Sequence, residues 1–81
     1  MTDHSWTREG DALTRHLEFD DFSQAFAFLA RVALLAEKHD HHPEIRNVYN
    51  RVDLKLTTHD AGNRVTEKDE TMAAQIDALL G

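Results

Sequence analysis

Hydrophobic and polar residues alternate in the N-terminal part of the chain, a pattern typical of strands with one buried face. The alternation runs from Ala12 to Phe19, with Arg15 as the exception on the apolar side. A shorter strand is expected around Trp6, because the turn signal Gly10-Asp11 separates it from the longer run. This part of the chain therefore predicts two strands.

The middle of the chain predicts a second pair of strands. The runs 45–49 and 52–58 are rich in β-forming residues. Asn50-Arg51 between them fits a two-residue hairpin turn, because asparagine tolerates a positive φ. In that register the shared apolar face consists of Ile45, Tyr49, Val52, Leu54 and Leu56.

Two helices are expected, one before and one after this hairpin. The first runs from about Phe22 to about His39, with an N-cap in Asp20-Asp21. The second begins at 66–69, where Thr66 is the N-cap and Asp69 can reach back to it. The expected apolar stripes are Phe22, Ala25, Phe26, Leu29, Val32, Ala33 and Ala36 in the first helix, and Met72, Ala73, Ile76, Leu79 and Leu80 in the second.

The order of these elements favours an antiparallel sheet with both helices on one side. We therefore expect an α+β fold, a four-stranded antiparallel sheet with two long helices packed on one face, in a single domain over residues 1–81. Phe28, Leu34 and Leu35 fall outside the stripe of the first helix. A helix that is apolar on more than one side needs a second partner, which in so short a chain would be another subunit.

Composition narrows the possible functions. Asp and Glu outnumber Lys and Arg by 15 to 9, so the net charge of −6 offers no basic surface for nucleic-acid phosphates. The absence of cysteine excludes disulfides, thiolate metal sites and cysteine nucleophiles. The apolar runs are too short for a membrane span, and residues 1–5 do not resemble the start of a signal peptide. We therefore expect a cytoplasmic protein that binds neither nucleic acid nor membrane.

Histidines at the ends of the second hairpin are the strongest candidates for chemistry. His41 and His42 precede it, next to Pro43, and His59 follows it. Because the two ends of a hairpin lie side by side, these loops should meet. Histidine exchanges a proton near neutral pH, which favours acid–base chemistry, although solvated loop residues are an alternative interpretation. We do not expect a metal site, because the pair lacks the His-x-x-x-His spacing that places two ligands on one helix face.

Three carboxylates could act with these histidines. Asp69 could pair with one of them and orient its ring, although helix capping is an equally good interpretation. Glu37 lies in the last turn of the first helix, where a negative charge is slightly unfavourable, so it is harder to dismiss as a solvated residue. Asp40 is better interpreted as part of a solvated helix terminus.

A set of short segments carries a wider pattern. It comprises Glu37-Lys38, His41-His42-Pro43-Glu44, Asn47-Val48-Tyr49-Asn50, Val52, Thr58-His59, Gly62 and Thr66-Glu67-Lys68-Asp69, and upstream Trp6, Leu17, Phe19, Asp21-Phe22, Ala25-Phe26 and Val32-Ala33. Together these segments resemble the pterin-4a-carbinolamine dehydratase family, also called 4a-hydroxytetrahydrobiopterin dehydratases. The resemblance covers essentially the whole chain, and the combined spacing is far more specific than a His-His pair.

The resemblance implies an enzyme that removes water from a 4a-hydroxytetrahydropterin to give a quinonoid dihydropterin. This reaction recycles the cofactor of aromatic amino acid hydroxylases, needs no metal or organic cofactor, and is carried out by homodimers or homotetramers. By resemblance, His41 and His59 are the acid–base candidates, and the catalytic residues are His41, His42, His59 and Asp69. Glu37 would support the histidines, and the pterin would be bound by Asp40, His41, His42, Pro43, Thr57, Thr58, His59 and Asp60.

The chain departs from the family pattern at three places. It begins close to Trp6, so the N-terminal helix usual in the family is expected to be absent or very short. Ile45 and Arg46 stand where aromatic residues are common, and the loop before Asp69 is one residue longer than the commonest form. Two other functions remain open. One is a role in a related pterin pathway such as molybdopterin metabolism. The other is a non-catalytic dimerisation or coactivator-type binding module, since some members of the family in animals also act as dimerisation cofactors of a transcription factor.

Overall fold

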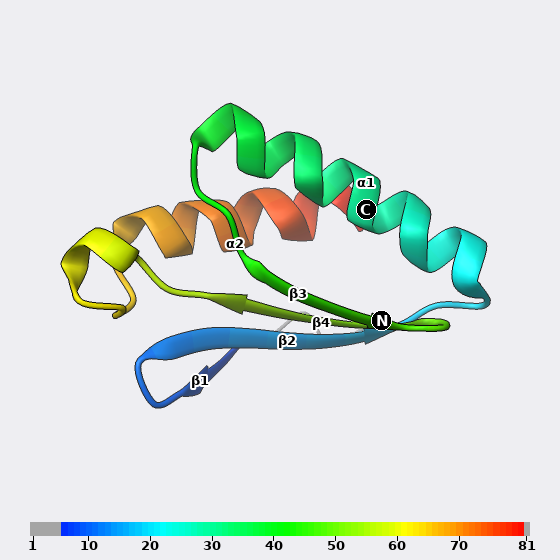
Figure 1. Cartoon of the computed structure of the whole chain (residues 1–81), viewed down its shortest axis with the longest axis horizontal. Helices are drawn as coiled ribbons and strands as arrows, with labels where there is room; N and C mark the ends of the chain where they lie inside the picture. Colours follow the sequence, from blue (N-terminus) through cyan, green and yellow to red (C-terminus); the bar gives the residue numbers. More distant parts are fainter. Residues whose placement is uncertain (1–5, 81) are drawn as a thin grey trace.

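Two helices cover one face of a four-stranded antiparallel sheet in the computed structural model, which describes residues 6–80 (Figure 1). This arrangement confirms the predicted α+β fold and the predicted order of its elements. The strand order in the sheet is β1-β2-β4-β3, and a short 3₁₀ turn, η1, follows β4. The bounds are β1 (Thr7–Glu9), β2 (Ala12–Glu18), α1 (Phe22–His39), β3 (Glu44–Val48), β4 (Arg51–Leu56), η1 (His59–Ala61) and α2 (Glu67–Leu79).

The core lies between the central strands and the helices. In the register of β2 and β4, Arg15 stands opposite Leu54 on the face that the helices cover. Arg15 is only 4% exposed, and its guanidinium forms an ion pair with Asp77 of α2. The indole N–H of Trp6 donates to the same carboxylate at 2.9 Å. Arg15, the charged exception in the alternating pattern of β2, therefore links the sheet to α2 through an ion pair.

The buried face of α1 differs from the predicted stripe. Phe28 is buried, whereas Phe22 and Phe26 are about half exposed and their rings lie against each other, with centroids 5.6 Å apart. The predicted stripe combined the two flanks of the helix and was wrong in part, because Phe28 rather than Phe26 packs into the core. The buried residues follow one continuous helical stripe: Ala25, Phe28, Leu29, Val32 and Ala36.

The turn of the second hairpin is shifted by one residue from the predicted Asn50-Arg51. Val48 pairs with Arg51, so the turn is Tyr49-Asn50, with Tyr49 at φ 51°. The amide group of Asn50 donates to the carbonyl of Phe19 at 2.8 Å, which fixes Asn50 within the turn. Tyr49 is consequently exposed and does not share the core face as predicted.

The register of the hairpin is otherwise close to the prediction. Ile45 lies opposite Leu54 and shares its face, but β3 is the edge strand and the side chain is 43% exposed. β4 ends at Leu56, two residues earlier than predicted, and the chain continues through an isolated bridge between Thr58 and Arg64. This early end leaves Thr57 and the residues after it free to form a loop at the end of the sheet.

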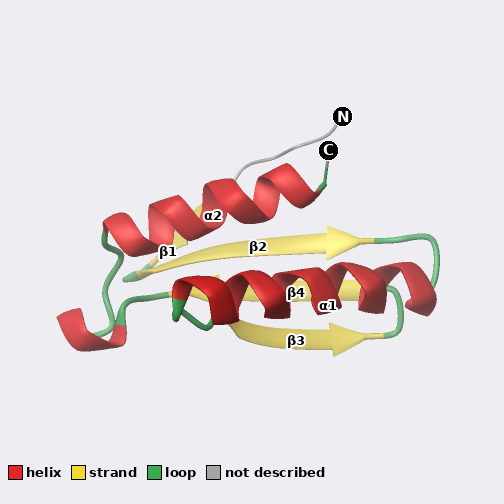
Figure 2. Cartoon of the chain, turned by 90° about the horizontal axis from the view of Figure 1, so that it is seen from above, coloured by secondary structure: helices red, strands yellow, loops and turns green. Residues whose placement is uncertain are grey.

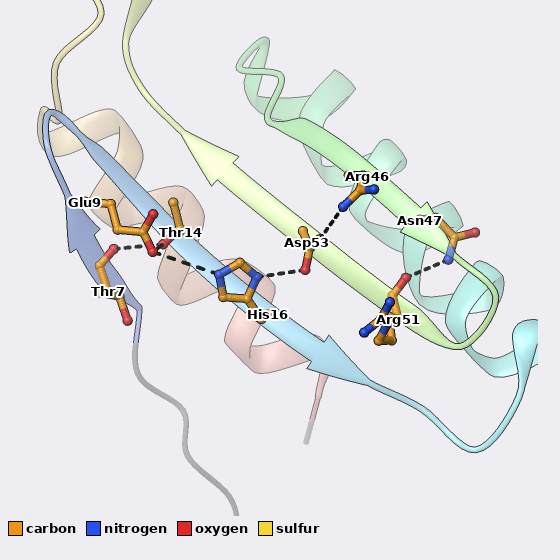
Figure 3. Close-up of polar contacts among 8 residues, drawn as sticks. All are labelled: Thr7, Glu9, Thr14, His16, Arg46, Asn47, Arg51 and Asp53. Carbon is orange, nitrogen blue, oxygen red and sulfur yellow. Dashed lines mark hydrogen bonds and ion pairs between the residues drawn. The ribbon is translucent and has the colours of Figure 1, made fainter.

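Polar side chains occupy the face of the sheet that is turned away from the helices (Figure 3). His16 donates from Nδ1 to Asp53 at 2.7 Å, and its Nε2 lies 3.9 Å from Glu9. Arg46 on β3 lies 3.8 Å from the other oxygen of Asp53. This face holds charged groups of both signs, and it is separated from the helices by the sheet.

No helix within residues 6–80 has the length and apolarity needed to cross a bilayer. The expectations about a signal peptide and an N-terminal helix concern residues 1–5, which lie outside the described residues.

Candidate active site

Three segments that are distant in the sequence meet at one end of the molecule. The C-terminal end of α1, the loop from β4 through η1, and the first turn of α2 lie together there (Figure 2). A cavity of about 250 Å³ opens among these segments. It is lined by Asp40, His41, His42, Thr57, Thr58, His59, Asp60 and Lys68. The two loops that flank the hairpin therefore meet around one cavity.

The backbone after α1 directs His41 inward. Asp40 adopts the left-handed conformation, with φ 50° and ψ 44°, and its N–H donates to the backbone carbonyl of Glu37 at 3.2 Å. The N–H of His41 then donates to the carbonyl of Ala36 at 3.0 Å. Bonds of this kind satisfy the last carbonyls of a helix and reverse the chain direction. The helix end thus holds the backbone of His41 in a fixed position.

His41 contacts Asp69 of α2. Its Nε2 lies 2.6 Å from Oδ1 of Asp69, and the two side chains are 11% and 0% exposed. An ionised carboxylate can only accept hydrogen bonds, so Nε2 of His41 is the donor. In a neutral imidazole the other ring nitrogen, Nδ1, is then unprotonated. The contact therefore defines which nitrogen of His41 can take up a proton.

Asp69 both caps its helix and contacts the histidine. Its second oxygen, Oδ2, accepts from the backbone N–H of Thr66 at 2.8 Å and from the hydroxyl of Thr58 at 2.7 Å. Burial raises the pKa of Asp69, but the hydrogen bonds from Thr58, His41 and Thr66 outweigh it, and the pKa lies below its ordinary value. The longer loop before Asp69 does not keep it from His41. Asp69 therefore fulfils both roles expected from the sequence, helix capping and pairing with a histidine.

The other two histidines of the cavity are exposed. His42 donates from Nε2 to Glu37 at 2.9 Å, and this pair lies in solvent, with side chains 57% and 80% exposed. His59 begins η1, and its Nδ1 donates to the amide oxygen of Asn63 at 3.3 Å. Each histidine therefore has a different partner, and that of His41 is the buried one.

Three residues proposed from the sequence are not among those that line the cavity: Pro43, Glu37 and Asp69. Pro43 was expected to bind the pterin, whereas Glu37 and Asp69 were expected to orient histidines, and they contact His42 and His41 respectively. Thr58 lines the cavity, but its hydroxyl is hydrogen-bonded to Asp69. Only Asp40, His41, His42, Thr57, Thr58, His59 and Asp60 of the proposed set line it directly.

Lys68 is a site residue that the sequence reasoning missed. It lines the main cavity and also a second one of about 230 Å³. The second cavity is lined by His39, His41, Glu67, Lys68 and Thr71, so His41 and Lys68 belong to both. The available signal was the position of Lys68 directly before Asp69, in the first turn of a helix. Lys68 adds a positively charged residue to a lining that also includes the acidic residues Asp40 and Asp60.

Metal ligation has no support among the described residues. Within residues 6–80, no group of three or more His, Asp or Glu side chains is placed to hold a metal ion. The geometry is that of a polar cavity whose walls carry groups that can exchange protons.

Comparisons with known proteins agree on one family. Residues 1–79 match the family model described as pterin 4 alpha carbinolamine dehydratase. A protein of Rhizorhabdus wittichii named "Putative pterin-4-alpha-carbinolamine dehydratase" is 62% identical over 69 residues, 85% of this chain and 70% of that protein. A protein of a Synechococcus species with the same name is 54% identical over 74 residues, 91% of this chain and 78% of that protein.

Two solved structures share the fold. A crystal structure from Brucella melitensis, described as a transcriptional coactivator/pterin dehydratase, has a TM-score of 0.87 and 51% identity, over 94% of this chain and 82% of that one. A pterin dehydratase-like protein described as a RuBisCO assembly factor in the alpha-carboxysome has a TM-score of 0.82 and 30% identity, over 98% and 95% of the two chains.

Proposed function

The chain belongs to the pterin-4-alpha-carbinolamine dehydratase family, and on this premise we propose that it removes water from a 4a-hydroxytetrahydropterin to give a quinonoid dihydropterin. The observation that carries the proposal is the buried Asp69–His41 pair, whose histidine lines a cavity together with His42 and His59. The site needs no metal or organic cofactor in this scheme.

The reaction requires one proton to be given and one to be taken. The bond between C4a and the hydroxyl oxygen breaks, and the oxygen leaves as water after receiving a proton. A ring nitrogen loses a proton, and its electron pair forms the new double bond. Both transfers are faster with a positioned acid and base whose pKa values lie near neutrality, a range in which histidine operates.

The surroundings of His41 favour it as the base. Asp69 holds the proton of His41 on Nε2, so Nδ1 is free to accept one from the ring nitrogen. The imidazolium that forms is then stabilised by the adjacent buried carboxylate. A histidine oriented by a buried aspartate acts as general base in this way in other enzymes.

His59 then supplies the proton to the leaving hydroxyl. It lines the same cavity from the β4 side, and its exposure lets it be reprotonated from solvent. His42, Asp40, Thr57 and Asp60 bind the pterin, with Glu37 holding His42. Pro43 contributes by restricting the backbone of the loop rather than by contact.

The physiological setting follows from the same proposal. The protein would recycle tetrahydropterin in the cytoplasm as a homodimer or homotetramer. The exposed apolar residues support an assembly of copies, because a monomer would leave them in water. Among the described residues, the large ones are Phe22, Phe26 and Leu34 on α1, Ile45 and Val48 on β3, Tyr49 in the turn after it, and Leu80 after α2.

The test is to generate 4a-hydroxytetrahydropterin enzymatically and to follow its dehydration by absorbance, with and without the purified protein. We expect saturable acceleration over the spontaneous rate. A folded protein that gives no acceleration would refute the dehydratase proposal. The same assay with pterins of other side chains, together with a molybdopterin-type ligand in a binding titration, distinguishes tetrahydropterin recycling from a related pterin pathway.

A second function, a non-catalytic binding module, is favoured by a different observation. The descriptions of the two solved relatives name a coactivator and an assembly factor. The exposed Phe22, Phe26 and Leu34 on α1 of this chain would serve contact with a protein. Substituting Phe26 with Ser should then remove partner binding and leave turnover unchanged, whereas loss of turnover would link that face to the enzyme.

A further inference from the structure

Thr58 is fixed in place by its backbone on both sides. It is 5% exposed, and its N–H donates to the carbonyl of Arg64 at 2.9 Å. Its own carbonyl accepts from Ala61 at 3.1 Å and from Asn63 at 3.0 Å. The side chain therefore has a fixed origin, and the hydroxyl group is aimed at α2.

The hydroxyl of Thr58 lies between two oxygen atoms of α2 and its cap. It is 2.7 Å from Oδ2 of Asp69 and 2.6 Å from the hydroxyl oxygen of Thr66. The ionised Asp69 cannot donate, so the one proton of Thr58 goes to the carboxylate. The hydroxyl of Thr66 must then donate to Thr58. The hydrogen bonds run in one direction, from Thr66 through Thr58 to Asp69.

This chain of bonds determines which oxygen of Asp69 meets the histidine. Oδ2 is occupied by the hydroxyl of Thr58 and the backbone N–H of Thr66, which leaves Oδ1 for Nε2 of His41. Without the hydroxyl, one of the two donors that hold Oδ2 is lost. The carboxylate can then rotate, and the proton on the ring of His41 is less firmly held on Nε2.

We propose that Thr58 is a positioning residue that acts through its side chain: it holds Asp69 so that His41 keeps its proton on Nε2 and presents Nδ1 to the substrate. This role rests on the proposed dehydratase function. Thr58 was expected from the sequence to bind the pterin. The role proposed here is a different one, because the hydroxyl is hydrogen-bonded to Asp69.

The test compares Thr58→Val, which removes the hydroxyl at nearly constant size, with Thr58→Ser, which retains it. Thr14→Val is the matched control, because Thr14 is 7% exposed and uses its hydroxyl on the far face of the sheet, toward Glu9 at 3.0 Å. For each protein, kcat and KM are measured, and the ring nitrogens of His41 are observed by ¹⁵N NMR against pH.

We expect Thr58→Val to lower kcat about tenfold, the lower end of what outer-shell partners contribute at metal sites. KM should change little, because the hydroxyl acts on proton transfer through Asp69 and not on pterin binding. Its NMR spectra should show a mixture of the two neutral forms of His41 instead of the Nε2–H form alone. Thr58→Ser and Thr14→Val should resemble the wild type in both measurements. If Thr58→Val is unfolded, Thr58→Cys provides the comparison, since a thiol is a weak donor of similar size.

Two results would overturn the inference. One is an unchanged Nε2–H form of His41 in the variant that lacks the hydroxyl. The other is an equal loss in Thr58→Ser, which would assign the effect to packing. If the wild type itself shows no turnover, the dehydratase proposal fails separately, and the NMR comparison still decides whether Thr58 controls the proton on His41.

Discussion

The carboxylate of Asp69 accepts a hydrogen bond from His41 at 2.6 Å with one oxygen and caps its own helix with the other. Residues 28 positions apart are thus brought together by the start of α2. Because the cap fixes the carboxylate before any ligand arrives, the histidine is oriented in advance. Preorganised groups of this kind need no rearrangement during a reaction.

Asp69→Asn should separate capping from proton control. The amide oxygen can still accept from Thr58 and Thr66, but the amide N–H₂ would face His41 and force Nε2 to become an acceptor. The proton would move to Nδ1, and kcat should fall by at least about a hundredfold, because a general base typically contributes a rate factor of that size or more. The control is Glu70→Gln, which removes the charge of an exposed carboxylate in the same helix. Turnover of Asp69→Asn close to that of the wild type would exclude the pair from the mechanism.

The lowered pKa of Asp69 predicts a pH dependence of stability. Its pKa in the folded state lies below the ordinary value of 3.8, so its ionised form stabilises the fold above that pH. This contribution is lost as the pH falls through the folded-state pKa. Urea unfolding should therefore show a larger loss of unfolding free energy below about pH 4 in the wild type than in Asp69→Asn. Parallel curves for the two proteins would contradict this assignment.

Glu37→Gln should have a mild effect. The pair that Glu37 forms with His42 is mostly exposed, so the unfolding free energy should change by less than about 1 kcal/mol. If His42 only binds the pterin, KM should rise a few-fold while kcat is kept. Steady-state kinetics and a urea titration decide this, and a fall in kcat as large as that of Asp69→Asn would give Glu37 a catalytic role.

Asp40 offers a test that separates backbone from side chain. Its φ of 50° favours glycine, so Asp40→Gly should keep or raise stability, by up to about 1 kcal/mol. Asp40→Asn tolerates the same backbone and removes only the charge. If the carboxylate binds the pterin, both variants should lose affinity equally in a binding titration. A loss in Asp40→Gly alone would point to the loop backbone instead.

Much of the fold was predictable because its signals are local. Asp21 accepts from the N–H of Gln24 at 2.8 Å, and both ends of α1 agree with the prediction. The face of α1 was not predictable from spacing, because apolar residues lie on both flanks and packing against the sheet chooses Phe28 over Phe26. The hairpin turn differs from the predicted one for a similar reason, because the side-chain amide of Asn50 donates a hydrogen bond to the carbonyl of Phe19, 31 residues away.

The site was predictable at the level of loops but not of partners. Hairpin geometry brings the segments of His41 and His59 to one cavity, as expected from their place at its two ends. The choice of Asp69 for His41 depends on the left-handed backbone of Asp40, which no spacing rule indicates. The place of Lys68 directly before Asp69 was a signal in the sequence, but its contribution to the cavity depends on how α2 begins and on which loops meet there.

The most direct test of the account is the dehydration rate of 4a-hydroxytetrahydropterin measured side by side for the wild type and His41→Asn. Asp69 keeps its bonds from Thr58 and Thr66 in that variant, so it should remain folded. The wild type should accelerate the reaction strongly, and His41→Asn should lose at least about a hundredfold of that acceleration. Equal acceleration by both folded proteins would exclude His41 from the mechanism.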